Sequence, residues 1–390
     1  MKICHVITRL IIGGAQENTV LTCRGLVEKG HDVTLIAGPE TGPEGSLWDE
    51  AEKAGCRLVK LDAMRRAVKP LYDLAARHQL RRLFTDLKPE VVHTHSSKAG
   101  ILGRSAAASA NVPVVVHTIH GMSFNRTQPA FIQWLYRSLE RWAARQTTAF
   151  VTVADAMIDQ SVSAGLAPRD RFVTVRSGIE TDDFVPDASE RTSLRAEWGA
   201  EEGDVVVGTI ARLFINKGYE EIIEAMPRAV QHCDKLKFVW IGDGANREQY
   251  LNRLEAMGLR NRVHLVGLIH PREVGRHING FDIVLHASRW EGLPRALVQG
   301  LLMGVPAVAF DNDGSPEVVR DGQTGILVPF GDTAKLSQAI VSLATDPDLR
   351  RKLGEHGQAR CREMFDWHTM VDQLDKLYLQ LSAKRKHSTF

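Results

Sequence analysis

A glutamate beside a glycine turn is the feature of this 390-residue chain that most suggests chemistry. Glu291-Gly292-Leu293-Pro294 follows the apolar stretch 282–287, which is typical of a buried parallel strand, and precedes a helical pattern that begins at Arg295. Such a turn directs backbone N–H groups beyond the carboxyl end of the strand, where they favour an anion such as a diphosphate. A carboxylate beside this anion site suits a neutral, hydroxyl-rich group such as a sugar.

Two cations, Arg212 and Lys217, follow the expected strand 205–210 and come before, or at the start of, the next helix. When a sugar leaves a nucleoside diphosphate, negative charge grows on the β-phosphate. Two fixed cations there would stabilise the transition state more than the ground state. The alternative is an ordinary surface loop that happens to carry an arginine and a lysine. No Asp-x-Asp pair is placed to hold Mg²⁺ or Mn²⁺ on the diphosphate.

Histidines mark the carboxyl ends of two expected strands in the first half. His120 follows the expected strand 112–117, at the edge where doubly wound sheets place their ligands. His93 and His95 flank the same edge. A zinc site built from His93, His95, His117 and His120 is therefore an alternative, although no carboxylate or cysteine completes the set.

Gly13-Gly14 lies where the first expected strand turns into a helix. Glycine allows positive φ and close backbone approach, so this loop could come up against a ligand. The spacing is not Gly-x-Gly-x-x-Gly, so a dinucleotide fingerprint is absent. On its own, the pair indicates a turn.

Length and composition indicate two soluble globular domains. A chain of 390 residues exceeds one ordinary core, and 44% hydrophobic with 25% charged residues is typical of folded proteins. A net charge of +2 gives no argument for nucleic acid as a partner. Five scattered cysteines with no Cys-x-x-Cys pair argue against a disulfide framework or structural zinc, and favour a reducing compartment.

The apolar N-terminus is interrupted by Arg9 and ended by glycines, so it is interpreted as a first strand and not as a signal peptide. No apolar run approaches the roughly 18 to 20 residues of a membrane span. We therefore expect a cytoplasmic protein, attached at most to the inner face of the plasma membrane.

Short Val/Ile-rich runs alternate with helical patterns throughout, which predicts doubly wound parallel sheets of the α/β class. Between the halves, residues 178–189 are polar and acidic and form a plausible hinge. The expected strands are residues 2–8, 32–37, 57–60, 91–94, 112–117, 149–153 and 172–175, then 205–210, 237–241, 262–266, 282–287, 307–310 and 325–328.

Two stretches of the first half are strongly basic. One lies around a helix and the other interleaves aromatic and basic residues over the helical pattern 131–146. They contain Arg65, Arg66, Lys69, Arg77, Arg81 and Arg82, then Trp134, Arg137, Arg141, Trp142 and Arg145. Such a helix can lie on an anionic membrane. A solvated face with core aromatics is the alternative.

Motifs in order over nearly the whole chain carry a family resemblance. They are Gly13-Gly14-Ala15, residues 93–100, 117–121 and 177–180, Arg212 with Lys217-Gly218, and residues 242–244, 291–299 and 311–317. With them the chain resembles the retaining glycosyltransferases of family 4, of the bacterial surface-polysaccharide type. These have the GT-B fold, two Rossmann-like doubly wound parallel-sheet domains facing across a cleft. The resemblance implies an acceptor-side domain over 1–180, a donor-binding domain over 190–365, and a last helix, 366–384, packing back on the first.

The resemblance also assigns roles to residues. Arg212 and Lys217 would hold the departing diphosphate, His120 would contact the donor sugar, and Glu291 would accept hydrogen bonds from its hydroxyls. The further implied donor-binding residues are Gly13, Gly14, Gly242, Gly244, Gly292, Leu293 and Gln299. A glutamate is usual in the family at the position of Gln299. The lost charge would weaken donor binding by about 1 kcal/mol, because charged hydrogen bonds are roughly twice as strong as neutral ones. Asp313 likewise stands where many relatives have glycine.

The resemblance implies metal-independent, cofactor-free and retaining transfer of a sugar. The donor would be a nucleotide-sugar, with UDP-sugars expected from family frequency. The acceptor would be a hydroxyl of a saccharide or lipid-linked saccharide. Two alternatives remain: a GT-B-fold sugar-nucleotide epimerase, and a non-catalytic partner protein motivated by Gln299 and Asp313.

Overall fold

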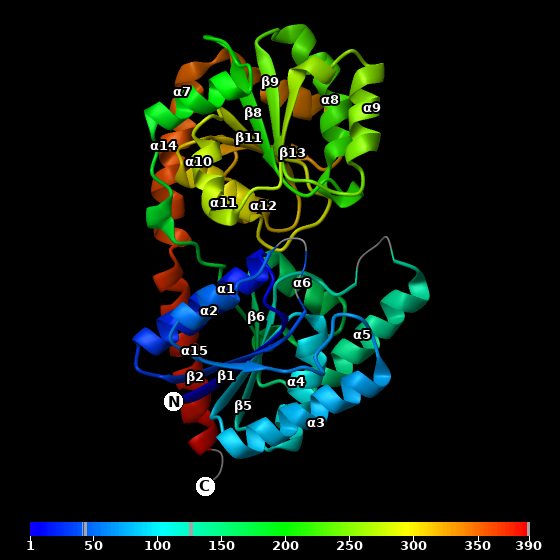
Figure 1. Ribbon diagram of the computed structural model, residues 1–390, viewed down its shortest axis with the longest axis vertical. Helices are drawn as coiled ribbons and strands as arrows, with labels where there is room; N and C mark the ends of the chain where they lie inside the picture. Colours follow the sequence, from blue (N-terminus) through cyan, green and yellow to red (C-terminus); the bar gives the residue numbers. More distant parts are fainter. Residues whose placement is uncertain (41, 43–44, 125–127, 388–390) are drawn as a thin grey trace. The chain divides into compact units, whose positions relative to one another are not determined.

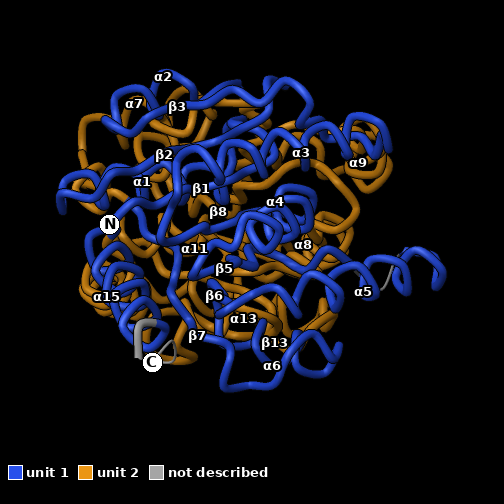
Figure 2. Tube along the Cα trace, turned by 90° about the horizontal axis from the view of Figure 1, so that it is seen from below, with its two compact units in different colours: residues 1–179, 367–390 blue, residues 180–366 orange. Residues whose placement is uncertain are grey.

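The computed structural model describes residues 1–40, 42, 45–124 and 128–387. Its chain forms two compact units, coloured separately in Figure 2: unit 1 contains residues 1–179 and 367–390, and unit 2 contains residues 180–366. The division at residues 179 and 180 falls inside the polar, acidic stretch 178–189 that the sequence indicated as a hinge.

Unit 1 is built on a parallel sheet of seven strands in the order β3-β2-β1-β4-β5-β6-β7. The strands are β1 (Lys2–Arg9), β2 (Asp32–Gly38), β3 (Arg57–Lys60), β4 (Val91–His95), β5 (Val114–Ile119), β6 (Ala149–Thr152) and β7 (Phe172–Thr174). Its helices are α1 (Gly14–Glu28), α2 (Trp48–Lys53), α3 (Pro70–Leu87), α4 (Ser97–Ser109), α5 (Ala130–Ala144), α6 (Asp155–Ser163) and α15 (Trp367–His387).

Separate hydrophobic clusters cover the two faces of this sheet. Helices α1, α2 and α15 pack with one face, and α3 and α4 pack with the other (Figure 1). Because both faces are covered, the central strands are buried, and residues 3–8 of β1 are all buried although His5 and Thr8 are polar.

Strand β5 starts and ends two residues later than we predicted. Pro113 has no N–H, and the N–H of Val112 bonds to the carbonyl of Ala107 in α4, so the ladder begins at Val114. The strand therefore runs through His117 to Ile119. His117 lies inside the strand, and His120 directly follows its carboxyl end.

The last helix, α15, belongs to the core of unit 1 although it follows unit 2 in sequence. Met370, Val371, Leu374 and Tyr378 are buried against α1 and the sheet. Gly25 of α1 permits this approach, since a Cβ there would lie 2.7 Å from a methyl of Val371. Periodicity had indicated only an amphipathic helix, without its docking surface.

Unit 2 is built on a parallel sheet of six strands in the order β10-β9-β8-β11-β12-β13. The strands are β8 (Val205–Ile210), β9 (Leu236–Ile241), β10 (Val263–Gly267), β11 (Ile283–His286), β12 (Ala307–Asp311) and β13 (Gly325–Pro329). Its helices are α7 (Ala188–Glu197), α8 (Tyr219–His232), α9 (Arg247–Ala256), α10 (Val274–Ile278), α11 (Arg295–Leu302), α12 (Ser315–Val318), α13 (Thr333–Thr345) and α14 (Pro347–Met364).

Both sheets have the doubly wound arrangement that the sequence predicted, and the fold class is confirmed. In each, the strand order reverses beside the first strand, between β1 and β4 and between β8 and β11. Open α/β sheets bind ligands outside the carboxyl ends of the strands at such a reversal. A ligand is therefore expected at the loops after β8 and β11 in unit 2, and at those after β1, β4 and β5 in unit 1.

Candidate active site

The structure brings Lys217 and Glu291 together at the reversal point of unit 2. Lys217 ends a 3₁₀ turn, Ile215–Lys217, shortly after β8, and Glu291 follows β11. The ammonium of Lys217 forms an ion pair with Oε1 of Glu291. Both side chains are partly exposed, at 17% and 21%, so the pair lies at the surface of the sheet edge and is not sealed in the core.

Ser288 and Asn312 hold this pair in place, and the sequence analysis assigned neither of them a role. Ser288 Oγ lies 2.9 Å from Oε1 of Glu291 and 3.1 Å from the carbonyl oxygen of Asn216. The amide of Asn312 donates to the carbonyl of Ser288 at 3.2 Å. Sequence reasoning missed these roles because the bonds join loops after three different strands. The only signal for Asn312 was its place inside the motif 311–317.

Asp313 fixes the backbone of Glu291. Its carboxylate accepts a hydrogen bond of 2.9 Å from the N–H of Glu291. Its own φ is 48°, in the left-handed region, which explains why glycine is common at this position in the family that the sequence resembles. The aspartate therefore keeps the strained turn and adds an acceptor that glycine lacks.

Glu291 is held as a carboxylate. Burial raises the pKa of Glu291, but the charge of Lys217 and the hydrogen bonds from Lys217 and Ser288 outweigh this and leave the pKa below its usual value. His286, whose Nε2 lies 3.8 Å from Oε1 of Glu291, is buried, and burial lowers its pKa to about 4. At neutral pH the ion pair of Lys217 with Glu291 thus lies beside a neutral imidazole.

The turn after Glu291 leaves backbone donors available. Within the described part of the chain, no hydrogen bond uses the N–H of Gly292 or Leu293. Both residues are buried, and they precede α11, whose first residue is Arg295. Pro294 is the N-cap of this helix, which begins at Arg295 as expected. Gln299 lies one turn along α11 and is half-buried.

Glycines allow the loops of unit 2 to pack tightly around this edge. At Gly218, φ is 77° and a Cβ would lie 1.8 Å from the carbonyl oxygen of Ala287, at the end of β11. Gly242 and Gly244 follow β9 and lie against the carbonyls of Ala211 and Leu213, with virtual Cβ distances of 2.1 and 2.5 Å. The loops after β8, β9 and β11 can therefore meet only because these positions have no side chain.

Arg212 occupies the same loop as Lys217. Its side chain is exposed, and its guanidinium carbon lies 5.1 Å from the ring centroid of Phe214. The neighbouring N–H of Leu213 bonds to the carbonyl of Asp243, which ties this loop to the Gly242–Gly244 turn. The structure thus places Arg212 on the loop that carries Lys217, five residues earlier in the chain.

The remaining predicted site residues lie in unit 1. Gly13 is the N-cap of α1 and Gly14 its first residue. The φ of Gly13 is 170°, which is extended backbone open to any residue, so the positive φ that we considered there is not used. His120 directly follows β5, is half-buried, and places Nε2 3.1 Å from Nδ1 of His95.

The histidines of unit 1 do not gather in the set that the zinc alternative requires. One nitrogen each of His5, His93 and His95 lies within 4.8 Å of the others, whereas His117 bonds to the hydroxyl of Thr94 at 2.9 Å. Both ring nitrogens of His93 are also engaged in hydrogen bonds. The cluster is accounted for as a hydrogen-bonded core.

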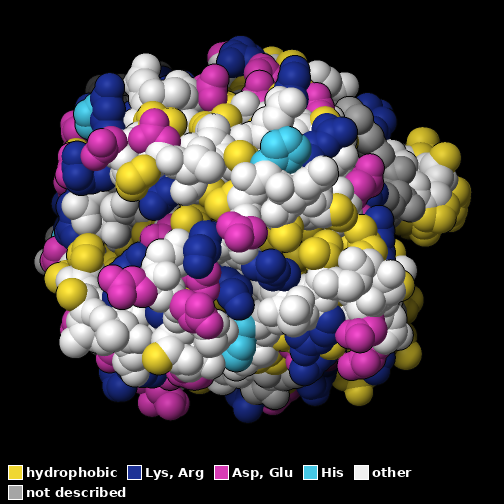
Figure 3. Space-filling model, turned by 90° about the horizontal axis from the view of Figure 1, so that it is seen from above, with side chains coloured by type: hydrophobic (Ala, Val, Ile, Leu, Met, Phe, Trp, Pro, Cys, Tyr) yellow, Lys and Arg dark blue, Asp and Glu magenta, His cyan; other side chains and the backbone are white. Residues whose placement is uncertain are grey.

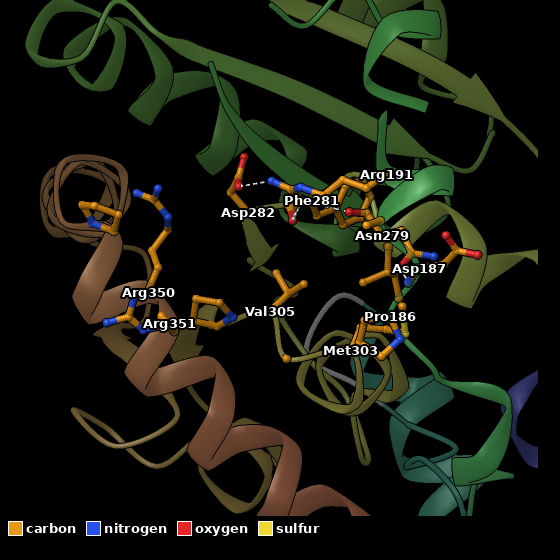
Figure 4. A pocket seen from close by; sticks show the side chains of 15 residues that line it. Pro186, Asp187, Arg191, Asn279, Phe281, Asp282, Met303, Val305, Arg350 and Arg351 are labelled. Carbon is orange, nitrogen blue, oxygen red and sulfur yellow. Dashed lines mark hydrogen bonds and ion pairs between the residues drawn. The ribbon is translucent and has the colours of Figure 1, made fainter. Parts of the chain in front are cut away.

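A pocket of about 460 Å³ lies at the opposite, amino-terminal edge of the unit 2 sheet (Figure 4). Its walls include Asp282 and Val305, which precede β11 and β12. Figure 4 shows Arg191 directed at Asp282, with which it forms an ion pair of 2.6 Å. Arg350 donates to the last carbonyls of α13. Both arginines thus stabilise the fold. The pocket is separate from the candidate site because it lies at the other edge of the sheet.

Comparison with known families matches both halves of the chain. A glycosyl transferase 4-like domain model matches residues 13–178, and a model of glycosyl transferases group 1 matches residues 190–360. The chain belongs to the glycosyltransferases. This confirms the family and the enzyme class that the motifs suggested.

Relatives of this glycosyltransferase extend over nearly its whole length. It is 26% identical over 389 residues to the UDP-Gal:alpha-D-GlcNAc-diphosphoundecaprenol alpha-1,3-galactosyltransferase of Escherichia coli, covering 99% of this chain and 98% of that protein. It is 22% identical over 386 residues to the capsular polysaccharide biosynthesis glycosyltransferase CapM of Staphylococcus aureus, covering 97% and 96%. The crystal structure of Anabaena HepE in complex with UDP and glucose matches with a TM-score of 0.82 at 20% identity, covering 97% and 100%.

The structural likeness supports the GT-B fold, which is thereby confirmed for this glycosyltransferase. The Escherichia coli relative uses, by its name, a nucleotide-sugar donor. Within the described residues, every helix is too short or too polar to cross a bilayer.

Proposed function

We propose that this glycosyltransferase transfers a sugar from a UDP-sugar to a saccharide hydroxyl with retention of configuration and without a metal ion. Unit 2 would bind the donor and unit 1 the acceptor. The observation that carries the proposal is the contact of Lys217 with Glu291 beside the unused N–H groups of Gly292 and Leu293. A cation and backbone donors suit a diphosphate, and a carboxylate suits sugar hydroxyls.

In the proposed reaction, the bond between the anomeric carbon and the β-phosphate oxygen breaks as negative charge grows on the departing diphosphate. Lys217 and Arg212 stabilise this charge. The acceptor hydroxyl attacks from the same face, and its proton passes to the departing phosphate. No side chain in the described site is placed as a convincing nucleophile for a covalent intermediate, so front-face attack is favoured.

Names of relatives support the choice of substrates. The Escherichia coli relative uses, by its name, a UDP-sugar and a diphosphoundecaprenol-linked acceptor, and the Anabaena structure contains UDP. We propose a UDP-sugar donor and a lipid-linked saccharide acceptor for this chain. A sugar-nucleotide epimerase is not favoured, since the relatives are transferases, and incubating the donor alone without finding an isomerised nucleotide-sugar would separate the two.

Replacing Lys217 tests the proposed donor site. A donor is first chosen by thermal-shift screening against UDP- and GDP-sugars. We then expect Lys217→Ala to reduce turnover several hundred-fold, about 3 to 4 kcal/mol, because a fixed charge opposite the leaving group is lost. Lys335→Ala is the matched control, as this lysine of α13 is 59% exposed and lies 3.9 Å from Asp332. Near wild-type turnover in Lys217→Ala would remove Lys217 from its role.

A lipid-linked acceptor requires access to a membrane surface, and we propose that helix α5 provides it. Phe131 and Trp134 are 67% and 61% exposed and stack with ring centroids 6.0 Å apart, and Trp142 is 43% exposed. The aromatic residues are thus not core, which argues against the alternative interpretation of this helix. Figure 3 shows hydrophobic side chains gathered at the right-hand edge, where α5 of unit 1 extends in Figure 1.

Basic residues accompany this aromatic surface. Arg141 and Arg145 of the same helix region are exposed, as are Lys69, Arg81 and Arg82 on and beside α3. A cationic helix with exposed aromatics suits an anionic interface, where rings enter the headgroup layer and arginines meet phosphates.

Vesicle binding tests the membrane proposal. We expect the protein to sediment with phosphatidylglycerol vesicles at low salt and much less with phosphatidylcholine vesicles. Replacing Phe131 and Trp134 together with alanine should reduce this binding at least several-fold, because the buried apolar area is lost. Leu379→Ala, at another exposed apolar residue (52%), is the control and should bind like the wild type. Equal binding of both variants would contradict the role of α5.

A further inference from the structure

A row of three histidines runs from the core of unit 1 to its carboxyl edge. Nδ1 of His5, in β1, lies 3.0 Å from Nε2 of His95, at the end of β4. Nδ1 of His95 lies 3.1 Å from Nε2 of His120, directly after β5. His5 and His95 are 0% and 1% exposed, so the row connects a sealed core position with a half-buried residue at the ligand-binding edge.

The two inner histidines are neutral. Burial lowers the pKa of His5 to about 3 and that of His95 well below its usual value. A neutral imidazole has one N–H donor and one bare acceptor nitrogen. Each hydrogen bond in the row therefore fixes which nitrogen of the next ring carries the proton.

The environment of His5, at the inner end of the row, determines which nitrogen donates in each hydrogen bond. Nε2 of His5 is buried and has no hydrogen-bond partner among the described residues. A buried N–H without an acceptor is costly, and orphaned N–H groups are rarer than under-used acceptors. His5 thus carries its proton on Nδ1 and donates to Nε2 of His95. His95 then donates from Nδ1 to Nε2 of His120, and the proton of neutral His120 resides on its Nδ1.

Packing holds the rings of this row. The ring of His95 lies 5.2 Å from that of His5 at an interplanar angle of 15°, and 4.3 Å from that of His93. His93 cannot swing away, because its two nitrogens bond to the hydroxyls of Tyr378 at 2.5 Å and Thr118 at 2.6 Å. His93 thus packs against the row and restricts the ring of His95, but it is not hydrogen-bonded to the row.

We propose that His5 and His95 are positioning residues that hold His120 in one ring orientation and in its Nδ1–H tautomer. This inference rests on the proposed function for its consequence: His120 would then meet the donor sugar as a neutral group with its N–H in a fixed place. A hydroxyl-rich ligand can both donate and accept, so the tautomer determines which of its hydroxyl orientations is bound.

Nitrogen NMR of protein labelled with ¹⁵N-histidine tests the tautomer directly, without any activity assay. The His120 signals are assigned by their loss in His120→Ala. In the wild type we expect a protonated Nδ1 and an unprotonated Nε2. A protonated Nε2, or an equal mixture of tautomers, in the wild type would overturn the proposal.

Two substitutions at His95 then test whether the row selects the tautomer of His120. In His95→Asn the amide nitrogen takes roughly the place of Nδ1 and can still donate to His120, whereas His95→Leu removes this donor. We expect the Nδ1–H tautomer to persist in His95→Asn and to lose its selection in His95→Leu. An unchanged His120 tautomer in a folded His95→Leu would contradict the proposal.

Kinetics separates this inference from the proposed function. We expect His95→Leu to lower kcat/KM for the donor about tenfold, the effect of roughly one hydrogen bond, and His95→Asn to recover most of it. Tyr378→Phe is the control, because it removes a buried hydrogen bond from the same cluster but outside the row. Equal losses in Tyr378→Phe and His95→Leu would indicate core damage and overturn the positioning role. A wild type with the expected tautomer but no transferase activity would refute the proposed function and leave the row intact.

Discussion

At the residue scale, neighbouring side chains determine the protonation state of the candidate site's titratable groups. Glu291 stays ionised because Lys217 and Ser288 offset the effect of burial on its pKa. Asp313, whose own backbone is left-handed, holds Glu291 by accepting a hydrogen bond from its N–H. The residue types were visible in the sequence, but the partners of each were not. A hydrogen bond between residues 22 positions apart leaves no local pattern.

Removal of divalent cations tests whether side chains alone meet the charge of the diphosphate. We expect EDTA to leave turnover unchanged, because in the proposed function Lys217, Arg212 and the N–H groups of Gly292 and Leu293 would supply the stabilisation that a metal ion could otherwise give. Initial rates with EDTA are compared with rates after Mg²⁺ or Mn²⁺ is restored. Activity that is abolished by EDTA and returns only with Mn²⁺ would contradict the metal-free proposal.

At the scale of elements, the site depends on how closely loops approach at the end of the unit 2 sheet. The loop after β8 can lie against the end of β11 only because Gly218 has no side chain. The same holds for Gly242 and Gly244 after β9. The motifs indicated glycine at these positions, and the structure supplies the reason in each case, which is a carbonyl oxygen within 2.5 Å of the place a Cβ would occupy.

Alanine at Gly218 tests this close approach. Gly218→Ala should destabilise unit 2 by at least about 2 kcal/mol more than Gly258→Ala, because it adds a steric clash to the cost of the left-handed backbone. Gly258 is the matched control, with φ of 67° and no atom within 4 Å of a virtual Cβ. The free energies of unfolding in urea give the comparison. Similar values for the two variants would show that the loop can move without penalty.

At the scale of the whole molecule, the order of the chain and the division into units do not coincide. Helix α15 comes last but completes the core of unit 1, with Leu374 2% exposed. Unit 1 therefore cannot finish its core until the residues of α15 are present. Its stability depends on a segment separated from the rest of the unit by all of unit 2.

Core truncations in the two units test this assignment. Leu374→Ala should destabilise unit 1 by about 2 to 5 kcal/mol, whereas Leu343→Ala, at a fully buried leucine of α13, should destabilise unit 2 by a similar amount. Urea unfolding followed by hydrogen exchange reports the two units separately. If Leu374→Ala weakened protection in unit 2 and spared the strands of unit 1, the assignment of α15 would be wrong.

The sequence by itself determined the fold class, the family and the set of chemically capable residues. Alternating strand and helix patterns arise from local burial periods, and glycine, lysine and glutamate positions were legible as motifs. Strand ends were also predicted closely, and the largest shift is in β5, where Pro113 delays the start of the strand.

The tertiary structure alone decided which side chains touch. The ion pair of Lys217 with Glu291, its support from Ser288, Asn312 and Asp313, and the histidine row all join segments distant in sequence. Parallel sheets bring such loops together through crossovers, and the meeting point depends on packing of the whole unit, which no local pattern encodes.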